Sequence, residues 1–208
     1  MPIYPDLNLI FVHVPKTAGS AIVAALSDHG LPRPHSLWRR LSSHLPFAEP
    51  IDKVWLRRHI SARWMKVKLG DDVWDRFHSF AVVRDPYDRA VSSYEFARQR
   101  PNLRRHKAAV KRSFVEFLRA EPADRMQQAP MLTDRSGALL VQKVLRHETL
   151  AEDLARMCRI WGLTITLPPH PVNATTRAPK NSYLTDEAVA IINHRADRDF
   201  DLFDYPRR

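Results

Sequence analysis

The segment Pro-Lys-Thr-Ala-Gly-Ser at residues 15–20 places an ammonium group and two hydroxyls within a few positions of one another. Lys16 carries the ammonium, Thr17 and Ser20 carry the hydroxyls, and Gly19 permits backbone angles that side chains hinder. In a tight loop before a helix, these groups and nearby backbone N–H groups would bind an anion, most naturally a phosphate. The alternative is a buried strand-to-helix corner whose lysine only reaches solvent, and the segment by itself leaves both interpretations open.

This segment differs from the common nucleoside-triphosphate loop. That loop needs a glycine, four further residues and then Gly-Lys-Ser/Thr, whereas Lys16 here precedes Gly19, the one glycine of residues 12–20. We therefore expect a P-loop-like phosphate-binding turn that holds its anion differently, and a second phosphate-binding segment elsewhere in the chain.

A second candidate segment begins where another apolar run, Phe80–Val83, ends. Asp85 is a good N-cap and Pro86 suits the first helical position, so a helix should start here. Arg84 would lie at the carboxyl end of the strand, where open α/β sheets bind ligands, and Ser92 follows two turns into the helix. A guanidinium and a hydroxyl could hold a second phosphate. The plainer interpretation is an ordinary corner with a solvated arginine.

Strands and helices alternate around these two segments. The apolar run Leu7–Val14 predicts a buried strand, and Ser20 can cap a helix over Ala21–Leu26. A third apolar strand is expected at Leu139–Leu145, followed by a helix over Leu150–Trp161. This order predicts an α/β fold, a three-layer sandwich with a mainly parallel central sheet, formed by residues 1–208 as a single domain.

Shorter elements should connect these. We expect a helical turn within His35–His44, a short strand at Lys53–His59, a capped helix from Ser61 to Gly70, a second at Asp71–Phe77, a helix from Pro86 to about Arg98, another from Ser113 to about Glu121, a loop at Gln127–Arg135, a short extended segment at Leu163–Leu167 and a last helix from Thr185 towards Phe200.

Charge and cysteine content limit the possible partners. The chain has 33 Lys and Arg against 23 Asp and Glu, a net charge of +10, so its surface should attract polyanions such as nucleic acid, a phosphorylated cofactor or an acidic glycan. Cys158 is the only cysteine, and no Cys/His cluster has zinc spacing, so we expect no disulfide and no metal. With no apolar membrane span and no secretory signal, a soluble, cytoplasmic protein is expected.

Together, His-Val-Pro-Lys-Thr-Ala-Gly-Ser and Val-Val-Arg-Asp-Pro-Tyr-Asp-Arg-Ala-Val-Ser-Ser-Tyr resemble the two cofactor-binding signatures of sulfotransferases that use 3'-phosphoadenosine 5'-phosphosulfate (PAPS). The similarity is closest to the carbohydrate 2-O-sulfotransferase-like branch. It continues through Ser113–Leu118, Leu139–Cys158 and Leu202–Tyr205 and so covers most of the chain.

The resemblance implies which residues bind PAPS. The 5'-phosphosulfate would be held by Lys16, Thr17, Ala18, Gly19 and Ser20, and the 3'-phosphate by Arg84 and Ser92. One departure matters, because many relatives carry hydroxyls at both positions after the loop glycine, whereas Ser20 is followed here by Ala21. One possible contact to the phosphosulfate is therefore missing.

Sulfuryl transfer also needs a base, since an acceptor hydroxyl is a poor nucleophile until its proton is accepted. Lys16 would stabilise the charge that develops on the departing phosphate. In the branch that this chain resembles, a histidine before an apolar residue and a serine looks like the base, and His59-Ile60-Ser61 matches that position. Glu95 and Glu148 are fallback bases, although Glu148 could equally cap a helix.

Two further segments have open roles. The basic run Arg98–Arg112 is either a solvated loop or a surface that recruits an acidic acceptor such as a uronic acid polymer. Pro168–Ser182 is either a plain linker or a lid over the cofactor, in which case Arg177 or Lys180 would contact a phosphate. The loop at Gln127–Arg135 could border the acceptor site.

The leading hypothesis is therefore transfer of the sulfuryl group of PAPS to a hydroxyl, with a saccharide as the expected acceptor and adenosine 3',5'-bisphosphate (PAP) as product. A kinase-like phosphotransferase is the alternative, disfavoured because the usual phosphate loop and an acidic partner for magnesium are missing. A nucleic-acid-binding module has only the net charge in its favour, and no nucleic acid is expected as partner. The acceptor, the hydroxyl that is sulfated and the oligomeric state are left open by the sequence.

Overall fold

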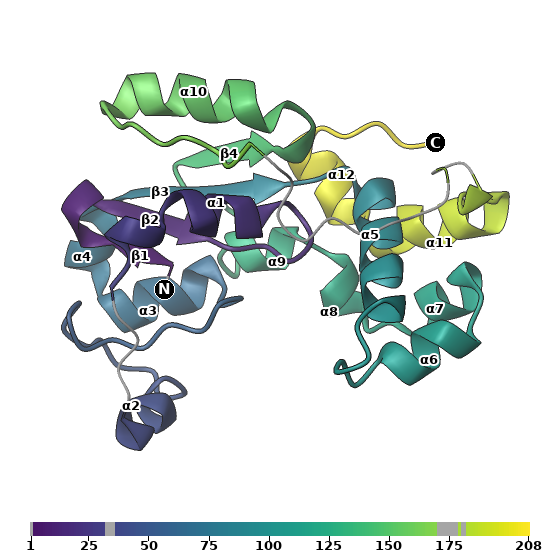
Figure 1. The fold of residues 1–208 in the computed structure, drawn as a ribbon, viewed down its shortest axis with the longest axis horizontal. Coiled ribbons are helices and arrows are strands. Elements are labelled where there is room, and N and C mark those ends of the chain that lie inside the picture. Colours follow the sequence, from purple (N-terminus) through teal and green to yellow (C-terminus); the bar gives the residue numbers. More distant parts are fainter. Residues whose placement is uncertain (1, 32–35, 170–178, 180–181) are drawn as a thin grey trace. The chain divides into compact units, whose positions relative to one another are not determined.

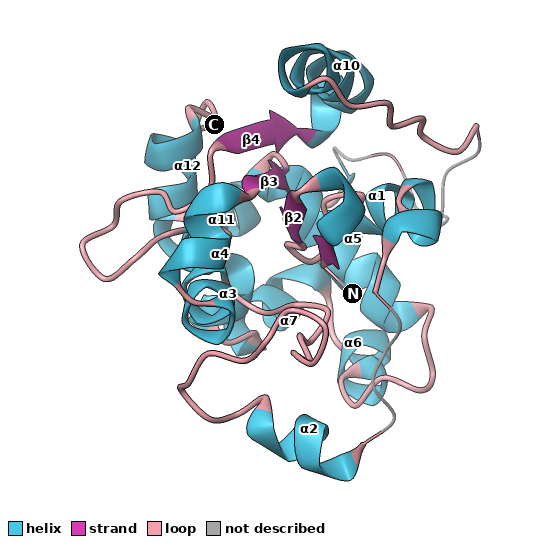
Figure 2. Cartoon of the chain, turned by 90° about the vertical axis from the view of Figure 1, so that its left-hand side faces the viewer, coloured by secondary structure: helices cyan, strands magenta, loops and turns pink. Residues whose placement is uncertain are grey.

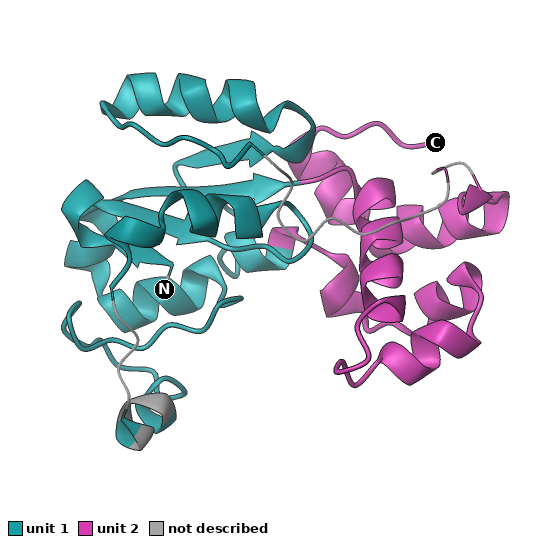
Figure 3. Cartoon of the chain, viewed as in Figure 1, with its two compact units in different colours: residues 1–83, 130–172 teal, residues 84–129, 173–208 magenta. Residues whose placement is uncertain are grey.

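The computed structural model describes residues 2–31, 36–169, 179 and 182–208. The chain forms two compact units, and each is built from two separate stretches of sequence (Figure 3). The first contains residues 1–83 and 130–172, and the second contains residues 84–129 and 173–208. That residues 1–208 act as one domain stays a prediction.

A four-stranded sheet is the centre of the first unit. Its strands lie in the order β1 (Ile3–Tyr4), β2 (Leu9–Val12), β3 (His78–Val83) and β4 (Lys143–Arg146). The short β1 pairs antiparallel with β2, whereas β2 with β3 and β3 with β4 are parallel. The prediction of a mainly parallel α/β sheet is therefore confirmed.

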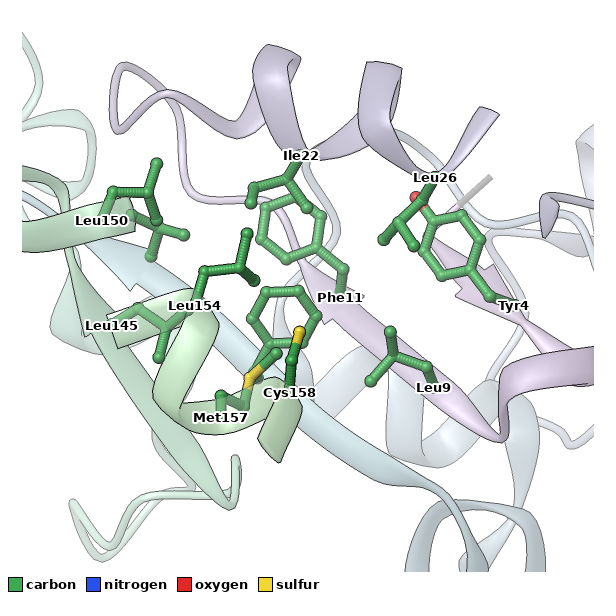
Figure 4. Packing of buried hydrophobic residues seen from close by; sticks show 12 residues of the cluster. Tyr4, Leu9, Phe11, Ile22, Leu26, Leu145, Leu150, Leu154, Met157 and Cys158 are labelled. Atoms are coloured by element: carbon green, nitrogen blue, oxygen red, sulfur yellow. The ribbon is translucent and has the colours of Figure 1, made fainter. Parts of the chain in front are cut away.

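Helices cover both faces of this sheet, which gives the predicted three layers (Figures 1 and 2). Helices α1 (Gly19–Ala25) and α10 (Leu150–Trp161) lie on one face, and α3 (Ala62–Leu69) and α4 (Asp71–Arg76) lie on the other. The register places Phe11 beside Phe80, and Figure 4 shows α1 and α10 directing apolar side chains onto this part of the sheet. The cluster consists of Tyr4, Leu9, Phe11, Ile22, Leu26, Phe80, Val82, Leu145, Leu150, Leu154, Met157 and Cys158.

The first and the third predicted strands are shorter in the structure. Leu7 belongs to the 3-10 turn η1 (Pro5–Leu7), so β2 starts at Leu9. The third strand starts at Lys143 instead of Leu139, because Leu139 forms an isolated bridge with Thr133 and the Leu140 N–H donates to the Leu132 carbonyl. A hydrophobic pattern marks burial, and the hydrogen-bonding partner decides where the ladder begins.

One predicted strand, Lys53–His59, is wrong. Val54 and Leu56 are buried as the apolar pattern predicts, but the stretch joins no ladder. The N–H groups of Lys53 and Val54 both donate to the carbonyl of Pro50 in a turn. The stretch therefore runs as an irregular connection into α3, and His59 lies on a turn just before that helix.

Capping residues are where the sequence predicted them. Ser61 accepts from the Trp64 N–H at the start of α3, and Asp85 accepts from the Asp88 N–H at the start of α5 (Pro86–Arg98). Ser113 and Glu116 form a capping box, and Thr185 accepts from the Ala188 N–H. Gly70 ends α3 with φ of 78°, an angle that favours glycine.

The second unit is helical. Helix α5 contacts α6 (His106–Lys111), α7 (Phe114–Ala120) and α11 (Asp186–Arg195). The predicted last helix is in fact two, because the chain breaks at Ala196 between α11 and α12 (Asp197–Phe203). The remaining elements are η2 (Ser27–His29), the predicted turn α2 (Leu37–Ser42), α8 (Ala123–Met126), α9 (Ala129–Leu132) and η3 (His147–Thr149).

One remaining expectation needs correction. The stretch Gln127–Arg135 is not a simple loop, because α9 lies within it. Leu163–Leu167 joins no strand, although Leu163, Ile165 and Leu167 pack against the core cluster. Among the helices that the structure describes, none has both the length and the apolar character needed to cross a membrane.

Candidate active site

The predicted phosphate-binding turn follows β2 directly and leads into α1. Lys16 and Ala18 have φ of 70° and 67°, so two residues with side chains occupy the left-handed region. That conformation costs roughly 1–2 kcal/mol per residue, and strain of this kind is concentrated at functional sites. The buried hydroxyl of Thr17 donates to the Val14 carbonyl at 3.0 Å and so holds the turn closed.

Ser20 does not cap this helix. Helix α1 begins at Gly19, so Ser20 is already its second residue. The residue at the N-cap position is Ala18. The Ser20 hydroxyl instead accepts a hydrogen bond from Nη2 of Arg58 at 2.9 Å. No local pattern predicts this contact, because the two residues are 38 positions apart.

Gly19 is required by a close contact with His13. A Cβ placed on Gly19 would lie 2.1 Å from Cδ2 and 2.2 Å from Nε2 of the His13 ring, well inside van der Waals contact. His13 is buried, and among the described residues its Nδ1 has no hydrogen-bond partner. Burial above all, together with the nearby His59 and Arg58, lowers the pKa of His13 to about 3. His13 is therefore a neutral ring that shapes the turn.

His59 lies beside His13 with its Nδ1 held by the main chain. Nδ1 is 3.0 Å from the carbonyl oxygen of His13, and the two rings meet edge to face with centroids 4.5 Å apart. Since a carbonyl oxygen can only accept, Nδ1 must carry the proton, and Nε2 of the neutral ring is then the proton acceptor. This is the tautomer that a general base acting through Nε2 needs.

The protonation state of His59 also suits a base. Burial of its ring lowers the pKa below the usual 6.5, the bond to His13 opposes this, and the positive charge of Arg58 lowers it further. The side chain as a whole remains exposed, so an incoming molecule can reach it. At neutral pH the ring is neutral and accessible.

Arg84 and Ser92 belong to the second unit. Arg84 is the first residue after β3, and Ser92 lies in the second turn of α5; both are buried. The main chain of Arg84 is held by the side chain of Gln128, whose Oε1 accepts from the Arg84 N–H at 2.9 Å and whose Nε2 donates to the Arg84 carbonyl at 2.8 Å. Gln128 takes the place of a strand partner just where β3 has ended.

Asp199 in turn fixes Gln128. Its carboxylate accepts from the N–H of Gln128 at 2.8 Å and from the N–H of Ala129 at 2.7 Å, and it is fully buried. Burial raises the pKa of Asp199, while the N–H groups and the charge of Arg89 act in the opposite direction. Both Gln128 and Asp199 were missed by the sequence analysis, because a glutamine in an apparent loop gives no sign of being buried.

Replacing Gln128 with leucine should lower the free energy of unfolding by roughly 2–6 kcal/mol, because it removes two buried hydrogen bonds to the Arg84 main chain at about 1–3 kcal/mol each. Urea denaturation measures this. Gln127→Leu is the matched control, since the one hydrogen bond of the Gln127 side chain among the described residues goes to the Arg195 carbonyl. Equal stability of the two variants would contradict the role of Gln128 in holding the main chain of Arg84.

The fallback bases lie in unlike surroundings. Glu95 is buried, and its carboxylate accepts from Arg98, Gln99 and Tyr183, so its oxygens are already engaged. Glu148 is exposed in η3. Arg177 and Lys180 lie outside the described residues. Within the described part of the chain, no three His, Cys, Asp or Glu side chains gather as a metal site would require.

The basic run Arg98–Arg112 is partly structural. Arg98 pairs with Glu95 and Arg105 pairs with Glu121, so these two guanidinium groups help to hold the second unit together. Much of the remaining positive charge is exposed, on Arg104, Lys107, Lys111 and Arg112. The second part of the run forms α6.

Comparison with known proteins identifies the family to which this arrangement belongs. The family model described as "Sulfotransferase family" matches residues 2–206. Among solved structures, the crystal structure of a sulfotransferase from Alicyclobacillus acidocaldarius is similar, with 16% sequence identity, 96% of each chain covered and a TM-score of 0.47. No curated protein matches the sequence.

Proposed function

Since the chain belongs to the sulfotransferase family and is a sulfuryl-transferring enzyme, we propose that its donor is PAPS and its acceptor a hydroxyl of a carbohydrate. The observation that supports this mechanism best is the bond between Nδ1 of His59 and the His13 carbonyl. It leaves Nε2 as the proton acceptor in a ring close to the turn that holds Lys16.

The donor groups of the turn fit a phosphosulfate. Lys16 supplies an ammonium, Ser20 a hydroxyl and Arg58 a guanidinium, and each of these groups can donate hydrogen bonds to an anion. Gly19 has no side chain, so an anion can approach its backbone closely. Groups of this kind bind sulfate and phosphate oxygens. PAPS, when bound, supplies an activated sulfuryl group on a phosphate leaving group.

Three residues would have separate roles in sulfuryl transfer. Nε2 of His59 accepts the proton of the acceptor hydroxyl while that oxygen forms its bond to sulfur and the bond from sulfur to the bridging oxygen breaks. Lys16 stabilises the negative charge that the bridging oxygen gains. His13 holds the proton of His59 on Nδ1 through its carbonyl, and so keeps the reacting nitrogen free of it.

We assign the 3'-phosphate to Arg84 and Ser92. Arg84 follows β3 directly, and so begins at the carboxyl end of a strand in a mainly parallel sheet. The carboxyl ends of such strands are the usual ligand position in open α/β sheets. Contacts of Arg177 or Lys180 with a phosphate, and the cytoplasmic location, likewise stay proposals.

An acidic saccharide is the acceptor class that the surface favours. The exposed charges of Arg104, Lys107, Lys111 and Arg112 have one sign and lie within a short stretch of the second unit. Guanidinium and ammonium groups attract carboxylates and sulfates of uronic acid polymers. A weaker dependence of the acceptor KM on salt after these charges are neutralised would support the proposal, and an unchanged one would contradict it.

Thermal unfolding with PAP tests the donor class. PAP at about 100 times its Kd should stabilise the protein by about 2.7 kcal/mol, or roughly 5–10 °C in Tm for a chain of this size, without magnesium. Adenosine 5'-monophosphate should give a smaller shift, because it lacks the 3'-phosphate. Stabilisation by ATP that requires magnesium would instead indicate a phosphotransferase.

A further inference from the structure

Arg58 approaches the predicted phosphosulfate turn from a distant part of the sequence. Its Nη2 donates to Oγ of Ser20 at 2.9 Å, although no feature of residues 53–59 predicted such a contact. The arginine itself is exposed, and it immediately precedes His59, whose ring packs on His13. The anion-binding turn and the base therefore share Arg58 as their common neighbour within the first unit.

The direction of this hydrogen bond has a chemical consequence. A serine hydroxyl can accept and donate at the same time, so a bond received from Arg58 leaves the Ser20 proton available for an anion. A guanidinium presents five N–H donors in a planar fork, of which the bond to Ser20 occupies one. A sulfuryl oxygen bound by Ser20 would lie within reach of the same fork.

The residue after Ser20 offers no further donor. Ala21 has no polar side-chain atom, so Ser20 carries the last hydroxyl of residues 15–21. Arg58 donates to that hydroxyl and so brings a charged group to this end of the turn.

We propose that Arg58 is a catalytic residue that binds the transferred sulfuryl group together with Ser20. This rests on the proposed PAPS-dependent function. The contact is to the sulfuryl oxygens, which PAPS has and PAP lacks. Arg58 therefore acts on turnover and not on the affinity for the adenosine bisphosphate product.

Arg58→Gln tests this assignment, with kcat, the KM for PAPS and the Kd for PAP measured on the whole protein. The value of kcat should fall about 100-fold, the size of effect seen when one preorganised donor is removed, while the Kd for PAP stays within about threefold. Arg58→Lys should recover part of kcat, because it keeps the charge and loses the fork. Arg57→Gln is the matched control, an exposed neighbour, and should behave as the wild type.

The pH profile gives a second readout, which reports the charge that Arg58 places beside His59. Among the described residues, the charged or titratable groups facing His59 are Arg58 and His13, and the positive charge of Arg58 lowers the pKa of His59. Without that charge the pKa of His59 rises. The acid limb of the kcat profile in Arg58→Gln should therefore move to higher pH.

The outcomes separate this inference from the proposed function. A wild type that neither binds PAP nor transfers sulfuryl groups from PAPS would overturn the proposed function. A wild type that does both, with an Arg58→Gln variant of unchanged kcat, would overturn the role of Arg58 alone. A loss of PAP affinity as large as the loss of kcat would also overturn it, since it would place Arg58 on the nucleotide.

Discussion

Replacing His59 with glutamine should lower kcat by about 10²–10⁴-fold, the usual contribution of a general base, and leave the Kd for PAP within a few fold of the wild-type value. Glutamine has a similar size and keeps polar atoms, but it cannot accept the acceptor's proton. Steady-state turnover of PAPS with a reactive acceptor measures the effect. His194→Gln, at an exposed histidine in α11, is the control and should leave kcat unchanged.

The same histidine fixes the acid side of the pH profile. His59 acts as a base only when neutral, and its pKa lies below 6.5, mainly through burial of the ring. Turnover should therefore be constant around neutral pH and fall as the pH drops through the pKa of His59, which lies below 6.5. A His59→Gln variant should lose this limb. Turnover close to wild type in that variant would exclude His59, and the exposed Glu148 would become the next base to test.

Replacing Lys16 with methionine should lower kcat by about 10²–10³-fold, because an ammonium aimed at the bridging oxygen is a preorganised electrostatic donor. PAP should bind more weakly as well, roughly tenfold, since it retains the 5'-phosphate. Methionine keeps an unbranched side chain of similar length and removes the charge and the N–H donors of the ammonium. Rapid measurement of a single turnover separates the chemical step from product release.

Lys66→Met is the matched control for this change. Lys66 lies in α3, and its ammonium pairs with Asp71 and Asp75 on the surface. Such pairs contribute about 0–1 kcal/mol, so this variant should show the wild-type kcat and a nearly unchanged Tm. A Lys16→Met variant with turnover equal to that of Lys66→Met would remove Lys16 from the mechanism.

Local signals in the sequence were enough for most of the fold. The N-caps Ser61, Asp85, Ser113 and Thr185 each bond to a backbone N–H three positions ahead, so their meaning is contained in a few residues. The same holds for Gly70, which ends α3 in the left-handed region. Alternating strands and helices then restrict the topology to a mainly parallel sheet.

Contacts between distant residues could not be obtained in this way. His59 bonds to the His13 carbonyl across 46 positions, and Arg58 bonds to Ser20 across 38. The type of neither residue indicates which partner it will have. The expected strand at Lys53–His59 failed for the same reason, because an apolar pattern reports burial and not a neighbouring strand. Gln128 was predicted to be part of a loop, although it is fully buried and hydrogen-bonded to Arg84 and Asp199.

Position 13 contributes to the site in two separable ways. Its side chain fills the space beside Gly19, but it is the carbonyl that fixes the proton on Nδ1 of His59. Every amino acid supplies that carbonyl. Substitution at position 13 can thus change the side chain that lies beside Gly19 and the His59 ring, while the main chain keeps the proton of His59 on Nδ1.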